Sequence, residues 1–255
     1  MRLLLLTLLA VSPAQAPGPE ARSLLGRPLF APPIPDERRQ RLEKNLAQAE
    51  QEARARPDDA DALIWLGRRT AYLGRFREAI AVFTRGREKH PGDARFLRHR
   101  GHRYISVREL DKAVADLTRA GEMLRGRPDE VEPDGEPNAL GIPTSTLHFN
   151  VWYHLGLAHY LRGDFEAALF AYRRCLEVSR DSPDRLVATS DWLYMGLRRL
   201  GRDDEARQVL APITAELKVI ENHAYWNRLL MYKGETAPED LLGQRQDGVE
   251  LATYG

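Results

Sequence analysis

Apolar and small residues along this chain alternate with polar residues in the pattern of paired amphipathic helices. The spacing predicts one helix over Ala60–Leu73 and a second over Phe76–Lys89, because apolar positions recur at intervals of three and four residues. Gly74 interrupts the pattern and predicts the turn between the two helices. Small residues at Gly67 and Ala79 would allow the helices to pack closely.

The pattern of this helix pair returns three times further along the chain. It recurs 34 residues later over Ala94–Arg127, again from Phe149, and a fourth time around the turn at Gly201. The shared small residues are Gly67, Gly101 and Gly156 in the first helices and Ala79, Ala113, Ala168 and Ala206 in the second helices. A 34-residue helix-turn-helix period resembles the tetratricopeptide repeat. Arg108 at a turn position and Tyr194 in the fourth pair depart from that pattern.

This resemblance implies an all-α fold, a right-handed superhelix (α-solenoid) of about four full repeats between partial capping repeats, over residues 37–243. A helix over residues 36–55 is expected to cap the start of the array. A helix from Glu221 to Lys233, followed by residues 238–242, forms the partial repeat at its end. The resemblance also implies a scaffold without enzymatic activity that binds a protein or an extended peptide in the concave groove of the superhelix.

The two ends of the chain fall outside the repeats. Residues 1–16 hold a basic residue, a short apolar run, and Ala14 and Ala16, which is the pattern of a cleaved signal peptide. The run is too short to span a bilayer, so we expect an exported protein, periplasmic or secreted, with no integral membrane segment after cleavage. Residues 17–36 form a proline-rich leader, and residues 244–255 form a tail without a period.

Composition narrows the classes of partner. The charge is nearly balanced, with 38 Lys and Arg residues against 37 Asp and Glu residues. A protein that binds nucleic acid would normally carry a basic excess, so no nucleic-acid partner is expected. Cys175 is the only cysteine, and its place in a column of small residues predicts a buried packing thiol.

The side of each first helix that faces away from the core of its repeat is the candidate groove. The candidate partner-binding residues are Asp61, Trp65, Arg68, Tyr72, Arg95, His99, His102, Asn150, His154, Trp192, Arg199, Tyr225, Arg228 and Tyr232. One column among them, the ring column, has a flat ring in every repeat: Trp65, His99, His154, Trp192 and Tyr225. Rings with interspersed arginines suit a peptide with acidic or aromatic side chains. The alternative is that some of these rings pack helix against helix.

Metal binding and catalysis are the competing readings of the same face. His99, His102 and His154 could approach one another closely enough to hold a transition metal, but neighbouring arginines crowd that place with positive charge. We therefore expect no metal and no cofactor. The sequence contains no nucleophile elbow, zinc-protease motif or phosphate-binding loop, so no catalytic residues are expected.

Two alternatives concern other surfaces. The protein could be a structural subunit of an envelope or secreted assembly that uses the convex surface formed by the second helices. An insertion at residues 128–148 separates the second and third repeats, and it contains five acidic residues but no lysine or arginine. The insertion could be a lid that competes for a groove containing arginines, or it could be a solvated loop.

Overall fold

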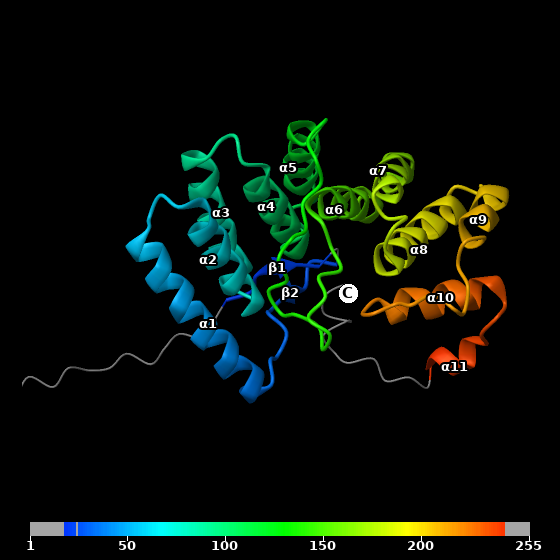
Figure 1. The fold of residues 1–255 in the computed structure, drawn as a ribbon, viewed down its shortest axis with the longest axis horizontal. Helices are drawn as coiled ribbons and strands as arrows, with labels where there is room; N and C mark the ends of the chain where they lie inside the picture. The colour runs from blue at the N-terminus through cyan, green and yellow to red at the C-terminus, as the bar shows by residue number, and fades with distance from the viewer. Residues whose placement is uncertain (1–17, 24, 243–255) are drawn as a thin grey trace, which may run out of the picture.

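The computed structural model describes residues 18–23 and 25–242 and shows an all-α array of paired helices (Figure 1). The helices are α1 (Asp36–Ala55), α2 (Ala60–Tyr72), α3 (Phe76–Lys89), α4 (Ala94–Ser106), α5 (Leu110–Met123), α6 (Leu147–Leu161), α7 (Phe165–Glu177), α8 (Pro183–Arg199), α9 (Asp203–Leu210), α10 (His223–Lys233) and α11 (Pro238–Leu242). The predicted signal peptide at residues 1–16 and tail at residues 244–255 lie outside the described residues. Most predicted helix boundaries agree with the structure to within two residues.

Local sequence explains where the helices begin and end. Side chains at the residues before α2, α4, α7 and α8 accept hydrogen bonds from backbone N–H groups of the first helical turn, as N-caps do: Asp59, Asp93, Asp164 and Ser182. Glycines with positive φ make the turns within three of the helix pairs: Gly74, Gly163 and Gly201. Arg108 occupies the equivalent turn of the second pair with φ 64°. The repeat geometry is therefore kept there by a residue for which this conformation is uncommon.

Small residues allow the helices of each pair to approach closely, as the sequence predicts. A Cβ atom on Gly67 would lie 2.3 Å from the ring of Phe83, and one on Gly156 would lie 2.6 Å from the ring of Tyr172. Neither distance can be tolerated without a shift of the ring. The glycine column is therefore a packing requirement of the repeat.

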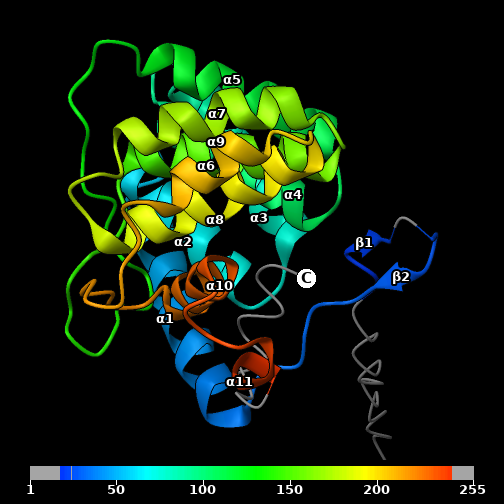
Figure 2. The same cartoon turned by 90° about the vertical axis from the view of Figure 1, so that its right-hand side faces the viewer.

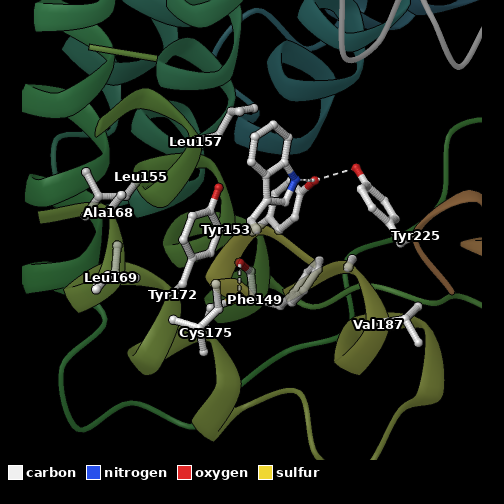
Figure 3. Packing of buried hydrophobic residues seen from close by; sticks show 14 of the residues in the cluster. Phe149, Tyr153, Leu155, Leu157, Ala168, Leu169, Tyr172, Cys175, Val187 and Tyr225 are labelled. Atoms are coloured by element: carbon white, nitrogen blue, oxygen red, sulfur yellow. Dashed lines mark hydrogen bonds between the residues drawn. The ribbon is translucent and has the colours of Figure 1, made fainter. Parts of the chain in front are cut away.

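The helices form two layers. First helices of successive repeats contact one another, α2 with α4, α4 with α6, α6 with α8 and α8 with α10, and so form the inner layer. Each also packs on the second helix of its own repeat. Figure 3 shows the core between α6, α7 and α8, where Tyr172 and Cys175 are fully buried. Burial raises the pKa of the Cys175 thiol to about 12, which agrees with the predicted packing thiol.

The leader contains a short hairpin that the sequence did not predict. Strands β1 (Ala21–Arg22) and β2 (Pro28–Leu29) pair antiparallel before α1 begins. The carboxylate of Glu20 accepts a hydrogen bond from the backbone N–H of Arg77 and so attaches this segment to α3. Figure 2 shows the hairpin on the opposite side of the molecule from the insertion. No helix among the described residues is long and apolar enough to cross a membrane.

Candidate functional site: the concave face and its insertion

The insertion crosses the inner side of the arc of helices (Figure 1). It runs from the end of α5 to Thr146, because α6 begins at Leu147 rather than after residue 148. A bridge between Val131 and Thr146 brings its two ends together. Its central residues contact side chains of α1, α2, α4 and α6, and they lie on the face where the candidate partner-binding residues were placed.

The first acidic residue of the insertion to contact the helices, Glu132, does so in a buried position. Glu132 forms an ion pair with Arg98 of α4, with 2.9 Å between Arg98 Nε and Glu132 Oε2. The two side chains are 10% and 8% exposed, respectively. Asn150 of α6 donates a hydrogen bond to the same carboxylate at 3.1 Å. This pair is shielded from solvent, so it differs from the weak, exposed ion pairs that are usual on protein surfaces.

Pro133 and Gly135 are held through their backbone carbonyl groups. Arg68 donates to the carbonyl oxygen of Pro133 at 2.8 Å, and Arg69 donates to the carbonyl oxygen of Gly135 at 2.6 Å. Gly135 is buried against Tyr72, and a Cβ atom there would lie 2.0 Å from the Tyr72 hydroxyl oxygen. Only glycine fits at this point without a shift of the tyrosine or of the insertion.

A second carboxylate contacts α1. Glu136 forms ion pairs with Arg38 and with Arg41, the latter at 3.2 Å. Burial acts to raise the pKa of Glu136, but hydrogen bonds from the two guanidinium groups outweigh it, so the pKa lies below its usual value. We call the five residues that hold residues 132–136 the arginine clamp: Arg38, Arg41, Arg68, Arg69 and Arg98.

The remainder of the insertion reaches the far end of the array. Asn138 and Thr144 both donate hydrogen bonds to the carboxylate of Glu221, just before α10. Glu221 is fixed in turn because Asp184 of α8 accepts hydrogen bonds from the backbone N–H groups of residues 220–222 at 2.7 to 3.0 Å. Asp184 is 1% exposed. The insertion therefore contacts both the first helix and the start of the last full helix.

The ring column is largely buried, so the expected open row of rings is wrong. His99, His154, Trp192 and Tyr225 are each less than 9% exposed, and only Trp65 is half-buried. The reason is that successive first helices lie against one another, so the ring position, two residues before Gly67, Gly101 and Gly156, faces the neighbouring helix. Whether any of these residues contacts a partner stays a prediction.

Tyr153, which the sequence did not single out, connects two of these rings. The hydroxyl group of Tyr153 accepts a hydrogen bond from the indole N–H of Trp192 at 2.8 Å and shares one with the Tyr225 hydroxyl at 2.6 Å (Figure 3). These three side chains come from α6, α8 and α10. The column thus fastens first helices together, which is the packing alternative that the sequence left open.

The other predicted residues are distributed along the face. Asp61 and Arg95 form an ion pair at 2.7 Å, and Arg199 is exposed and lies over the ring of Phe165. Tyr232 stacks on Tyr194, with 4.4 Å between ring centroids. Tyr72, Asn150 and Arg68 contact the insertion as described above. A cavity of about 220 Å³ lies between the insertion and α2 and α4, lined in part by Trp65, Arg68 and Glu132.

Arg228 forms a bidentate ion pair at the C-terminal end of this face. Its guanidinium group binds both carboxylate oxygens of Asp191 in α8, at 3.1 and 2.6 Å. Asp191 is fully buried. Burial raises the pKa of Asp191, and the contact with Arg228 opposes that change.

The histidines come together without forming a metal site. The rings of His102 and His154 are 3.9 Å apart, but His99 stacks on Phe83 instead. Burial, together with neighbouring arginines such as Arg98 and Arg103, lowers the pKa of all three histidines well below 6.5. They are therefore neutral at pH 7. Among the described residues, no group of three or more His, Cys, Asp or Glu side chains could hold a metal ion.

The most important contacts of this face involve residues that sequence reasoning did not select. They are Arg38, Arg41, Arg69, Arg98, Tyr153 and Asp191. Arg69 and Arg98 are adjacent in sequence to the predicted residues Arg68 and His99. Helical periodicity did not select them, because their role is evident only once the position of the insertion is known. The absence of basic residues in the acidic insertion was the one available signal, because such a segment needs cationic partners elsewhere in the chain.

Sequence models described as tetratricopeptide repeat match residues 66–122 and 149–182. In a comparison with curated proteins, no sequence matched the chain significantly.

Several solved structures have a similar fold. A crystal structure of MamA has 16% sequence identity and a TM-score of 0.52, and the match covers 80% of this chain and 96% of that one. The fragment "MamA 41-end" from Desulfovibrio magneticus RS-1 has 18% identity and a TM-score of 0.51, with coverage of 69% and 85%. At these identities, the likeness concerns the fold.

Proposed function

Because this chain belongs to the tetratricopeptide repeat proteins, with repeats at residues 66–122 and 149–182, we propose that it is a scaffold without catalytic activity that binds a protein or an extended peptide on its concave face. One observation carries the proposal. The concave face already holds an irregular chain segment, residues 132–136, through side chains of four helices of the array, α1, α2, α4 and α6. A face that holds its own chain in this way has the chemistry to hold another.

The proposed contact surface for the partner lies toward α8 and α10. There Tyr194 and Tyr232 are stacked and half-buried, and Arg199 is exposed. Flat rings provide contact area at low entropic cost, and guanidinium groups pair with carboxylates. These features favour a partner with aromatic or acidic side chains, and no nucleic acid or metal is part of the proposal.

Export is part of the same proposal. It rests on the charged, apolar and small-residue pattern of residues 1–16. The partner would then be a periplasmic or secreted protein, or the extracytoplasmic part of a membrane protein.

The convex surface offers a second candidate site. A hollow of about 610 Å³ between α5, α6 and α7 is lined in part by Trp152, Phe170 and Arg174. Phe170 is 63% exposed, which is unusual for a phenylalanine, and its ring packs edge-on against Trp152. This hollow suits the alternative function, a structural subunit that contacts its assembly through the second helices.

Photo-crosslinking separates the two faces. A photoreactive phenylalanine analogue would replace Tyr232 on the concave face in one variant and Phe170 on the convex face in another. The replacement of Arg85, an exposed residue of α3 that lines neither the concave face nor the hollow around Phe170, provides the control. We expect a specific partner to crosslink to the Tyr232 position alone. Crosslinking at the Phe170 position alone would replace the concave proposal with the convex one.

A further inference from the structure

Among the residues that the structure describes, the arginine clamp forms ion pairs with the insertion alone. Among the described residues, every ion pair of Arg38, Arg41 and Arg98 is with Glu132 or Glu136. Arg68 and Arg69 form no ion pair there and instead donate to carbonyl oxygens of the insertion. If residues 132–136 moved away, five guanidinium groups would be left together on one face. Burial already lowers the pKa of Arg98, and Arg68 lowers it further. An acidic segment is therefore needed on this face to balance the positive charge of the clamp.

The clamp and its neighbours make specific contacts with three residues of the segment, Glu132, Gly135 and Glu136. The contacts described here do not depend on the side chain of Pro133, nor does the side chain of Asp134 contact the clamp in them. Glu132 is enclosed by Arg98 and Asn150, Gly135 is pressed against Tyr72, and Glu136 is held by two arginines of α1. Pro133 contributes a carbonyl oxygen to the contacts described here, and Asp134 makes a local turn by accepting from the backbone N–H of Glu136. The pattern that fits is an acidic turn: two carboxylates four residues apart, with a glycine directly before the second.

Residues 132–136 are held by these exchangeable contacts, and the insertion adds little apolar packing. Val131, Leu140 and Ile142 are 63%, 66% and 48% exposed. Few apolar contacts would be lost if the segment left the clamp. A second segment with the same acidic turn could replace each ion pair and hydrogen bond by an equivalent one.

From the preceding contacts, we propose that the partner of the concave face presents an acidic turn of this chemistry and binds by displacing residues 132–136 from the arginine clamp. The inference rests on the proposed function, since it specifies the partner of the same face. The insertion is tethered beside the clamp, so it competes at a high effective concentration. Tight binding therefore requires either a partner with additional contacts toward α8 and α10 or an insertion that has been loosened.

The test uses a fluorescent nine-residue peptide with the sequence of residues 130–138, Glu-Val-Glu-Pro-Asp-Gly-Glu-Pro-Asn. Its binding is measured by anisotropy against the full chain and against a Glu132→Gln/Glu136→Gln variant, in which the clamp has lost its own acids. We expect the peptide to bind the variant at least about tenfold more tightly than the unaltered chain, since the tethered competitor is weakened. A peptide with glutamine at both glutamate positions should bind the variant about tenfold less tightly than the acidic peptide.

Two further variants keep the test decisive. Gly135→Ala in the full chain pushes the segment away from Tyr72 without removing a carboxylate, and it replaces the glutamine variant if that chain does not fold. Arg38→Gln/Arg41→Gln should remove most of the peptide binding, whereas the matched change Arg85→Gln/Arg87→Gln on the exposed side of α3 should not.

Equal binding of the acidic and glutamine peptides to a folded, loosened chain would overturn the inference. That result is distinguishable from failure of the proposed function. If a partner crosslinks at the Tyr232 position but the clamp does not bind the acidic peptide, the proposed binding of a partner on the concave face stands. Only the inference that the partner presents an acidic turn then fails.

Discussion

Single small residues determine how closely the helices of each repeat pack. Ala79, Ala113, Ala168 and Ala206 are all fully buried, although they are separated by long stretches of sequence. Each lies where a larger side chain would have to displace a neighbouring helix. Cys175 obeys the same rule, because it is buried among Phe149, Ser179 and Thr189 and acts as a small apolar residue.

Ala168→Leu is expected to lower the free energy of unfolding by about 1 to 3 kcal/mol, because the added atoms overpack the contact between α6 and α7. Thermal and chemical denaturation would measure the change. Ala115→Leu is the matched control, since Ala115 is an exposed helical residue of α5 and leucine is well tolerated there. Equal stability of the two variants would contradict the assignment of Ala168 to the core.

At this scale, the sequence predicted packing residues better than surface residues. The glycine and alanine columns could be identified because their spacing is local to each repeat. The ring column was assigned to the correct helices, but helical periodicity cannot tell whether the next first helix covers a side chain. His99, His154, Trp192 and Tyr225 are covered in this way, and Trp65 is only partly covered.

At the scale of elements, polar contacts attach α10 to the array. Asp184 and Asp191 both lie on α8, about two turns apart on its buried side, and both are less than 2% exposed. Asp184 holds the backbone before α10, whereas Asp191 holds Arg228 within α10. The capping element is therefore positioned by two buried carboxylates in addition to the apolar contacts of Leu229.

Arg228→Met is expected to destabilise the docking of α10 by about 3 kcal/mol, because it leaves the carboxylate of Asp191 buried without its partner. Limited proteolysis would show earlier cleavage between α9 and α10, and denaturation would measure the loss. The double variant Asp191→Asn/Arg228→Met should recover part of the stability, since no charge is then left buried. A double variant no more stable than Arg228→Met would argue against a penalty from the isolated carboxylate.

The contact between α4 and α6 makes stability depend on pH. The pKa values of His99, His102 and His154 are lowered in the folded chain, so the unfolded chain binds more protons below about pH 6.5. The free energy of unfolding should therefore decrease as the pH falls from 6.5, by up to about 1.4 kcal/mol per histidine for each pH unit. Denaturation curves at pH 7.5, 6.5 and 5.5 would measure this change.

A His102→Gln variant is the control for this prediction, because glutamine does not titrate. Its stability should depend on pH less steeply than that of the unaltered chain, by about one third of the three-histidine effect. Identical slopes would mean that His102 is not kept neutral by its surroundings.

At the scale of the whole molecule, the sequence predicted the array but not the path of the insertion. Repeats are recognisable because each helix pair uses the same local pattern. The contacts of the insertion join residues far apart in sequence, such as Arg38 with Glu136 and Asn138 with Glu221. No periodicity specifies such contacts, so the sequence could offer only the choice between a lid and a loop.

The path of the insertion has a mechanical consequence. A solenoid flexes like a spring, because each repeat contacts only its neighbours and small changes of angle add up along the array. Here the segment from Glu136 to Thr144 joins α1 to Glu221, two residues before α10, and so acts as a brace between the two ends of the array. Small-angle X-ray scattering should show a larger radius of gyration for Glu136→Ala/Glu221→Ala than for the unaltered chain, and equal values would mean that stacking alone sets the curvature. If the radius of gyration increases, the stiffness of the array depends on a segment that belongs to none of its repeats. Any ligand that displaced this segment would then also make the array more flexible.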